Sequence, residues 1–283
     1  MSFLSAENET RLRTAIAEHD LGSVESLIVE SAVECATLST TEPDDYSQPG
    51  VSRYGGLPDL PQGMNWPRDT RNRRLSFLLQ VNLAEVPSFA GKLVPDQGML
   101  YVFAEDWDLI ALFYAPASQT LLPASDLEEE GEDEDSLSNE DIAGLKPYHI
   151  AIRATIDLPE WTSDAHSAIT DALEAEGGDP DAASDQYNVL MKTLRGKDNS
   201  WAGKLQGRPC WIGYVPDGTH GDEAAALAAD PKLETEWRLL LLLDTNDAVN
   251  MMFGDAGYLQ VFIQRDALAQ RDFGNLFCQL ESS

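Results

Sequence analysis

The chain has 283 residues, of which 43 % are apolar, and a formal net charge of −30. This apolar share is typical of a globular protein with a sizeable buried core and excludes a disordered chain. The charge excludes a surface built for DNA, RNA or anionic membranes, because phosphate binding needs Lys and Arg to displace counterions. We therefore expect neither nucleic acid nor a membrane among its partners.

Most of the acidity lies in three segments. Residues 126–141 hold ten acids and no base, residues 157–185 hold nine acids and no base, and residues 217–236 hold six acids and Lys232. Together they carry −24 of the −30. Charge runs are usually solvated surface, so one interpretation is that the acidity only keeps the chain soluble. The other is that it attracts a cationic partner.

The pattern of apolar residues in the first quarter of the chain predicts helical structure followed by a strand. Apolar residues recur at helical spacing over residues 7–30, with Gly22 as a break. Alternation begins at Val33 and predicts a strand. Residues 52–74 are rich in Gly and Pro and predict little regular structure.

The rest of the chain predicts strands with two helices between them. Strands are expected at 77–83, 99–103, 109–114 and 148–157, with a solvated loop over the acidic residues 126–141. Helices are expected over 164–176, after Thr162 or Ser163 as N-cap, and from Pro180 to Gly196. Four more strands are expected at 210–215, 238–244, 258–263 and 276–280.

Three local patterns occur in the same order in both halves of the chain. Residues 55–58, 77–82 and 96–103 are echoed by residues 206–209, 239–244 and 255–262. A fixed order with similar offsets indicates an internal duplication. Glycine provides the turns and aspartate can bond to nearby backbone in them. The expected structural turn residues are Gly55, Gly56, Pro58, Asp96, Gly98, Gly254, Asp255 and Gly257.

The predicted fold class is therefore α+β, with two related β-rich halves. The halves cover about residues 46–158 and 197–283 and are joined by a helical insert over 159–196. An N-terminal helical segment and a first strand, residues 1–45, precede this domain.

The same motifs resemble the YwqG-like family, a bacterial domain family of unknown function. The resemblance rests on residues 52–58 (SRYGGLP), 66–67 (WP), 79–83 (LQVNL), 95–100 (PDQGML), 254–257 (GDAG) and 271–275 (RDFGN). It implies a mixed α+β fold with two related β-rich halves and brings no agreed reaction with it. Leu242 stands where such proteins often have Gln, so a polar site that needed this Gln would be weakened here.

No residue set indicates a reaction, a metal or a cofactor. The chain has no phosphate-binding glycine loop, no nucleophile elbow and no zinc-type spacing of His and Cys. Residues 244–247 lack the glycine and the closing Glu of a calcium loop and predict a turn. Cys210 is expected as a packed thiol and His149 as a surface or interface residue. The basic residues Arg68, Arg71, Arg73 and Arg74 are expected to face an acidic segment of the chain or to bind an anion.

Cysteine usage and the N-terminus predict a cytoplasmic protein. The three cysteines lie far apart and form no Cys-x-x-Cys pair, so free thiols in a reducing compartment are expected. The first ten residues carry two glutamates and lack the basic and apolar regions of a secretory signal.

The leading functional hypothesis is a non-enzymatic module that binds a basic protein through acidic surface. A specific form is an immunity-type protein that neutralises a basic, nuclease-like bacterial toxin, because an acidic face speeds association with a basic active site. The expected partner-binding residues are Asp164, Asp171, Glu174, Asp222, Glu223, Glu234 and Glu236. The alternative is a small-ligand binder or an enzyme with a polar site between the halves, formed by Gln80, Asn82 and Asp244.

Overall fold

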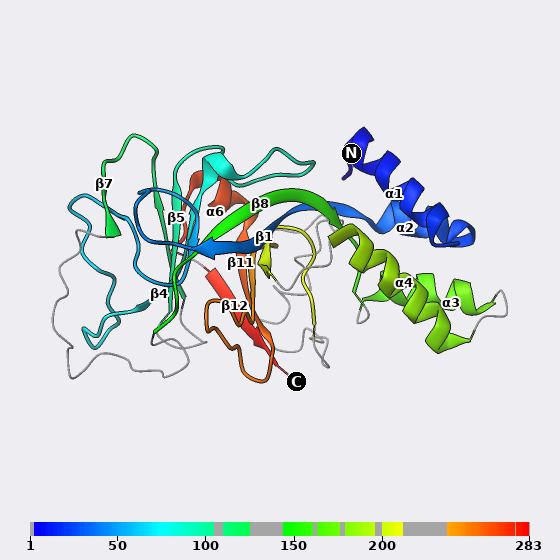
Figure 1. The fold of residues 1–283 in the computed structure, drawn as a ribbon. Helices are drawn as coiled ribbons and strands as arrows, with labels where there is room; N and C mark the ends of the chain where they lie inside the picture. The colour runs from blue at the N-terminus through cyan, green and yellow to red at the C-terminus, as the bar shows by residue number, and fades with distance from the viewer. Residues whose placement is uncertain are drawn as a thin grey trace.

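The protein is α+β and consists mainly of one large, curled, antiparallel sheet (Figure 1). This computed structural model describes residues 3–104, 110–124, 144–160, 163–175, 179–195, 200–211, 237–274 and 276–282. In their order across the sheet, the strands are β12 (Leu276–Glu281), β11 (Tyr258–Gln264), β10 (Trp237–Asp244), β9 (Trp201–Leu205), β1 (Val33–Pro43), β8 (Tyr148–Asp157), β2 (Arg53–Tyr54), β4 (Ser76–Asn82), β5 (Met99–Ala104) and β6 (Ile110–Ala115). A two-stranded sheet pairs β3 (Leu60–Pro61) with β7 (Leu121–Leu122).

Each end of the large sheet is built in a similar way. In the pairing of β4 with β5, the register shifts between Phe77 and Leu79, and in the pairing of β10 with β11 it shifts between Leu239 and Leu241. Such a shift is a β-bulge, which increases the local twist of the sheet. The long strands β1 and β8 pair with each other at the centre, so five strands lie on each side of their boundary.

Side-chain alternation gives the sheet two buried faces. Leu100 and Val102 of β5 belong to the main core, which also takes residues from β1, β8, β10 and β11. Their neighbours Tyr101 and Phe103 point to the opposite face and pack there in a smaller aromatic cluster. Another small cluster on β10 and β11 contains Phe262.

Helices before β1 and between β8 and β9 form a separate layer at one end of the molecule (Figure 1). They are α1 (Ala6–Glu18), α2 (Glu25–Ser31), α3 (Asp164–Ala175) and α4 (Pro180–Arg195). We call them the helical lobe. Leu12, Ile16 and Ile28 pack there against Ile169 and Tyr187 in a core of their own, and α4 contacts the end of β8. A short helix, α6 (Arg265–Gln270), follows β11, and 3-10 turns lie at Gly22–Val24 and Leu83–Glu85. Within the described residues, no helix is long and apolar enough to cross a membrane.

Most predicted elements are confirmed within one to three residues, and one predicted strand is described only at its first two residues. Residues 210–215 were expected to be a strand, but Cys210 and Trp211 lie in none, and residues 212–215 fall outside the described residues. The reason is that the side chain of Gln260 bonds both backbone groups of Cys210, at 2.9 and 2.7 Å, in place of a neighbouring strand. The strand of this region is β9, which the sequence analysis did not predict. The acidic residues 126–141 also lie outside the described residues.

Candidate functional site

A buried arginine organises a polar cluster in the first half of the sheet. Arg53 of β2 is fully buried and lies opposite Gln80 of β4 and His149 of β8. Its Nε donates to Asp44, and its Nη1 donates to Asp59 Oδ2 at 3.1 Å. Gly55 and Gly56, both with positive φ, turn the chain back so that Asp59 returns to Arg53. We call Arg53, Asp44, Asp59 and Gln80 the first polar centre.

Asp59 ties several segments together in this centre. Its Oδ2 accepts from Gly50 N at 2.9 Å and from Gln80 Nε2 at 2.7 Å, and its Oδ1 accepts from Ala124 N at 2.8 Å. Its backbone carbonyl accepts from Tyr101 Oη at 2.6 Å. These bonds satisfy the buried carboxylate and hold the segments of Gly50 and Ala124 against β4 and β5, so the described geometry fits a structural role.

A buried lysine organises another polar cluster on the other side of the sheet. Lys204 of β9 has only 1 % of its side chain exposed, and its Nζ lies 2.8 Å from Asp157 Oδ2 and 3.5 Å from Cys210 Sγ. The same Asp157 oxygen accepts from Arg208 N at 2.7 Å. Arg195 joins this group through Glu160. We call Lys204, Asp157, Cys210, Arg195 and Glu160 the second polar centre.

The electrostatics of the second polar centre favour inert, paired groups. Burial opposes the charged amine of Lys204, but its surroundings together, above all the carboxylate of Asp157, raise the pKa of Lys204. Burial raises the pKa of Cys210, which therefore stays a thiol, and a buried thiol is a poor nucleophile. Burial also opposes the charge of Glu160, yet Arg195 lowers the pKa of Glu160 to about 2. Each charge thus has a partner.

The three residues expected for a ligand site do not form one cluster in the contacts of the described chain. Gln80 belongs to the first polar centre. Asn82 caps the Leu83–Glu85 turn, accepting from Ala84 N at 3.1 Å and donating to Gly50 O at 2.8 Å. Asp244 ends β10, and burial raises its pKa to about 6, although a hydrogen bond with the Trp201 side chain opposes the shift. The carbonyl of Asp244 accepts from Tyr54 Oη at 3.4 Å, so β2 touches the end of β10.

The residues expected to bind a partner are only partly described. Asp164 and Asp171 of α3 are exposed and Glu174 is half-buried. Asp222, Glu223, Glu234 and Glu236 lie outside the described residues. Other exposed acids of the helical lobe and its turns are Glu7, Glu18, Asp20, Glu30, Asp179, Asp181 and Asp185.

The expected turn residues occupy turns or their edges. Gly55, Gly56, Gly98 and Gly254 have positive φ. A Cβ at Gly98 would meet the carbonyl of Ala115, and one at Gly257 would meet the carbonyl of Glu281. The remaining residues are Pro58, which is buried, Asp96, whose carboxylate binds Lys92 Nζ at 2.9 Å, and Asp255, whose N donates to Ser282 Oγ at 2.9 Å.

The sequence analysis missed the buried charges. Arg53 was part of a recognised motif, and Lys204 interrupts an apolar stretch, WAGKL. A charged residue in an otherwise apolar strand signals a buried ion pair. No comparable signal exists for Asp157 or Asp59, because acids are common throughout this chain.

The sequence profile of a family described as "Domain of unknown function (DUF1963)" matches residues 52–281. No curated protein matches the chain. The matched segment includes both polar centres except Asp44 and excludes α1, α2 and β1.

Proposed function

Since the chain belongs to the DUF1963 family, whose function is unknown, we propose a function from its own surface: it binds a basic protein without catalysis, through the acidic helical lobe. The observation that carries the proposal is the contrast between the two kinds of charge. The buried charges of the polar centres are paired, whereas acids such as Asp164, Asp171 and Asp185 are exposed.

The bases of the helical lobe leave this surface acidic. Arg13 is paired with Glu9 at 2.8 Å and with Glu25, and Arg195 is paired with Glu160. Arg11 donates to Leu194 O at 3.0 Å, and Lys192 is an exposed base among the more numerous exposed acids of the lobe. A surface of one sign steers an oppositely charged partner and raises the association rate.

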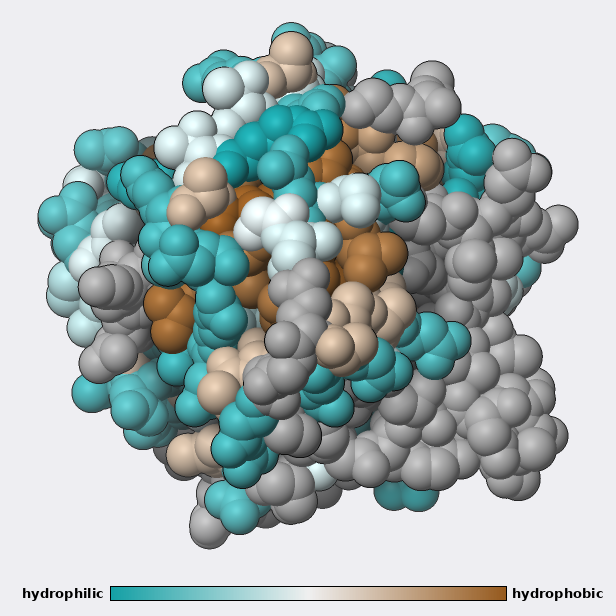
Figure 2. All heavy atoms as spheres, turned by 90° about the vertical axis from the view of Figure 1, so that its right-hand side faces the viewer, coloured by the Kyte–Doolittle hydropathy of each residue, from teal (hydrophilic) through white to brown (hydrophobic). Residues whose placement is uncertain are grey.

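Exposed and half-buried apolar side chains lie on the helical lobe together with the exposed acids. Figure 2 shows that end of the molecule, with hydrophobic residues near the centre of the view and hydrophilic residues around them. Val189 of α4 is 48 % exposed, and Leu27, Val29 and Met191 are half-buried. An apolar centre with a polar rim is the usual composition of a protein–protein interface. This supports the lobe as the binding face.

Charge-reversed variants test the proposal. Asp164→Lys with Asp171→Lys should abolish capture of the partner from a lysate of the native host, because it reverses part of the steering surface. Glu42→Lys with Asp247→Lys is the matched control, since it makes the same change in net charge at exposed sites outside the lobe. Captured proteins would be compared by mass spectrometry. Equal loss with both pairs, or loss with neither, would overturn the proposal.

An immunity-type role is the specific form of this proposal. Its support is charge complementarity alone: the active site of a nuclease is basic because it binds phosphates, and an acidic lobe would cover it. The expected location, the cytoplasm, agrees with three free cysteines. Protection of cells from a toxin encoded beside the gene would test this form separately from binding.

We further propose that the two β-rich halves arose by duplication within a YwqG-like chain. The sheet order supports it: β2, β4, β5 and β6 follow one another outward on one side, and β9, β10, β11 and β12 do so on the other. The bulges lie at corresponding places, Phe77/Leu79 and Leu239/Leu241. Arg53 and Lys204 also lie at corresponding positions, opposite Gln80 and Leu242.

If Gln80 and Leu242 are equivalent, the duplication also explains why position 242 can have Leu where YwqG-like proteins often have Gln. Gln80 bonds the backbone of Asp59 in the first half, and Gln260, one strand further out, bonds the backbone of Cys210 in the second. Superposition of residues 52–115 on 203–268 in a crystal structure is the test. Gly98 and Gly257 falling on unrelated turns would rule the duplication out.

A further inference from the structure

The ends of β9, β10 and β11 bring a carboxylate and two aromatic rings together on the face of the sheet away from the main core. Asp244, the last residue of β10, lies in register opposite Tyr258, the first residue of β11. Side chains at such opposite positions share one face, with Cβ atoms about 5 Å apart. The indole N–H of Trp201, the first residue of β9, donates a hydrogen bond to the carboxylate of Asp244. All three side chains are half-buried, so each keeps accessible surface.

The carboxylate of Asp244 lacks the cation that the buried acids of this protein have. In both polar centres, each carboxylate forms an ion pair with an Arg or a Lys. Within the residues that the structure describes, no Arg or Lys forms an ion pair with Asp244. Arg195 of α4 acts on Asp244 from a greater distance, but it is paired with Glu160 and its guanidinium lies over the Trp201 ring, 5.5 Å from the centroid.

The ionised form of Asp244 costs folding free energy. Burial raises the pKa of Asp244 to about 6, although hydrogen bonds from Trp201 and from the backbone of Thr245 oppose the shift. At neutral pH the carboxylate is therefore mostly ionised in surroundings that disfavour its charge. A bound cation would favour the charged form and recover this cost. Local features that lower stability occur mainly at functional sites.

The other charges around Asp244 favour a cation. Glu160 adds to the rise in the pKa of Asp244, so its negative charge acts on the same place, and Arg195 opposes it more weakly. Glu281 of β12 lies in register with Tyr258 on its other side and carries a further carboxylate. The row across β10, β11 and β12 is thus acid, tyrosine, acid.

The chemistry of the row selects an organic cation. Within the described residues, no group of three His, Cys, Asp or Glu side chains could hold a metal ion. One carboxylate beside Trp and Tyr instead suits an ammonium group, which is attracted to aromatic rings and donates hydrogen bonds. Tyr258 also packs against the aromatic cluster that contains Phe262, so an apolar stem attached to the ammonium group finds an apolar surface there.

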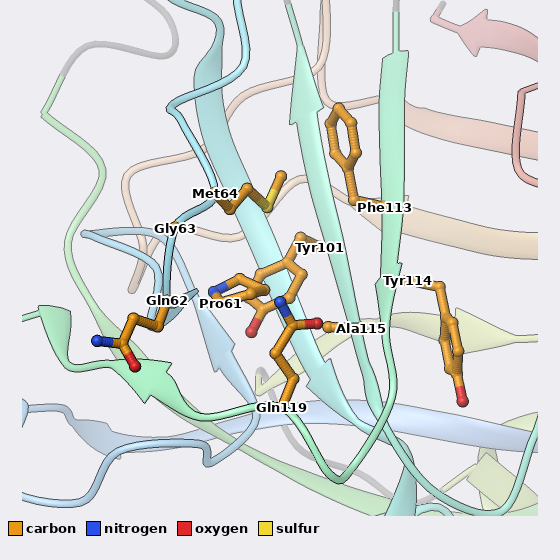
Figure 3. Close-up of a pocket in the computed structure, with 9 residues that line it drawn as sticks. All are labelled: Pro61, Gln62, Gly63, Met64, Tyr101, Phe113, Tyr114, Ala115 and Gln119. Carbon is orange, nitrogen blue, oxygen red and sulfur yellow. The ribbon is translucent and has the colours of Figure 1, made fainter.

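The small pocket beside β3 and β5 offers no comparable site (Figure 3). Its volume is about 230 Å³, and its walls come from the segment around β3, from β5 and β6, and from the turn after β6. Tyr101, Pro61 and Ala115 line it but are buried, and no charged side chain takes part in its lining. This pocket therefore gives a cation no partner.

We propose that Asp244, Trp201 and Tyr258 form a binding site for a small alkylammonium ion. The ammonium group donates to the carboxylate of Asp244 and lies against the rings of Trp201 and Tyr258, while the alkyl stem packs on Tyr258. The site does not use the exposed acids of the helical lobe, so it is independent of the function proposed above.

Indole N–H NMR of the whole chain tests the proposal. The chain has six tryptophans, and Trp201→Phe assigns the signal of Trp201. Butylammonium should shift this signal in a saturable way at constant ionic strength, with a Kd of about millimolar, as expected for a ligand of few atoms. Butanol, which has a similar shape without the charge, should bind at least about tenfold more weakly.

The affinity should also depend on the proton of Asp244. Because its pKa is about 6, the ionised fraction falls about tenfold between about pH 7.5 and pH 5, whereas an alkylammonium stays charged over this range. Binding of butylammonium should therefore weaken about tenfold. A Kd that does not change over this range would contradict a role for Asp244.

Two variants separate this site from general attraction to an acidic protein. Asp244→Asn keeps the shape of the side chain and should weaken binding at least about tenfold, because the charge is lost. Asp247→Asn is the matched control, since Asp247 is an exposed acid near the end of the same strand, and it should leave the Kd unchanged. If Asp244→Asn fails to fold, the pH dependence decides. No saturable shift with butylammonium, equal binding of butanol, or equal loss with both variants would overturn the proposal.

Discussion

Replacing Lys204 by Met tests whether the second polar centre stabilises the fold. Lys204 and Asp157 have 1 % and 2 % of their side chains exposed, and Nζ lies 2.8 Å from Oδ2. Methionine has a similar length but removes the charge, so Asp157 would stay buried without its closest cation. Removing one partner of a buried ion pair costs about 3–5 kcal/mol.

The surroundings of Asp157 place the expected loss toward the lower end of that range. Arg195 Nη2 lies 3.8 Å from Asp157 Oδ1, and Arg208 N still donates to Oδ2 at 2.7 Å. We therefore expect Lys204→Met to lower the free energy of unfolding by about 3 kcal/mol, a large part of the usual total of about 5–15 kcal/mol.

Urea unfolding, read by circular dichroism, measures this loss as a lower midpoint at an unchanged slope. Lys192→Met is the control, because Lys192 is exposed on α4 and its replacement should change stability by no more than about 0.5 kcal/mol. Adding Asp157→Asn to Lys204→Met should restore part of the loss, since no buried charge is then left alone. A loss below about 1 kcal/mol, or strict additivity of the two changes, would refute the reasoning.

Three further predictions concern other parts of the chain. Burial raises the pKa of Asp244 to about 6, so its contribution to stability is lost as pH rises from its ordinary pKa of 3.8 through about 6. Asp244→Asn should therefore stabilise the fold at neutral pH by up to about 3 kcal/mol, and identical urea curves for the variant and the wild type from acid to neutral pH would contradict this. Replacing residues 126–141 by a short Gly-Ser linker should leave the melting temperature within a few degrees in calorimetry, because a run of like charges buries little; a large drop would mean that the segment is docked. Association with a basic partner, followed by stopped flow, should slow at least about tenfold between about 0.1 and 1 M salt, as the screening length falls from about 10 to about 3 Å; a salt-independent rate would exclude steering by the acidic lobe.

Local patterns were enough to predict most helices and strands. Alternation over residues 148–157 predicted β8, and Pro180 marked the start of α4. Ser163, one of two predicted caps, accepts from His166 N at 3.2 Å. These features depend on residues within a few positions of one another, because side-chain periodicity and capping are properties of the local backbone. Cys210 lies outside any strand for a matching reason: its backbone partner, Gln260, is 50 residues away.

Fewer residues of the candidate sites could be predicted from the sequence, because the residues that contact one another there are far apart along the chain. Gln80 was named, but its partner Asp59 was one acid among 49 acidic residues. The pocket at Tyr101 was not foreseen, because its walls come from β3, β5 and the turn after β6. No local pattern shows that these segments meet.

The sequence by itself determined most of the secondary structure, the turns at Gly55, Gly56 and Gly98, and a strongly acidic net charge. Only the tertiary structure decided that β1 lies between β9 and β8, and that Arg53 and Lys204 are buried beside carboxylates. The physical reason is that strand pairing and the burial of charge are settled by which distant segments can satisfy each other's hydrogen bonds and exclude water together. The five residues of β9 do not show which strands pair with it, whereas the structure shows that it pairs with β10 and β1.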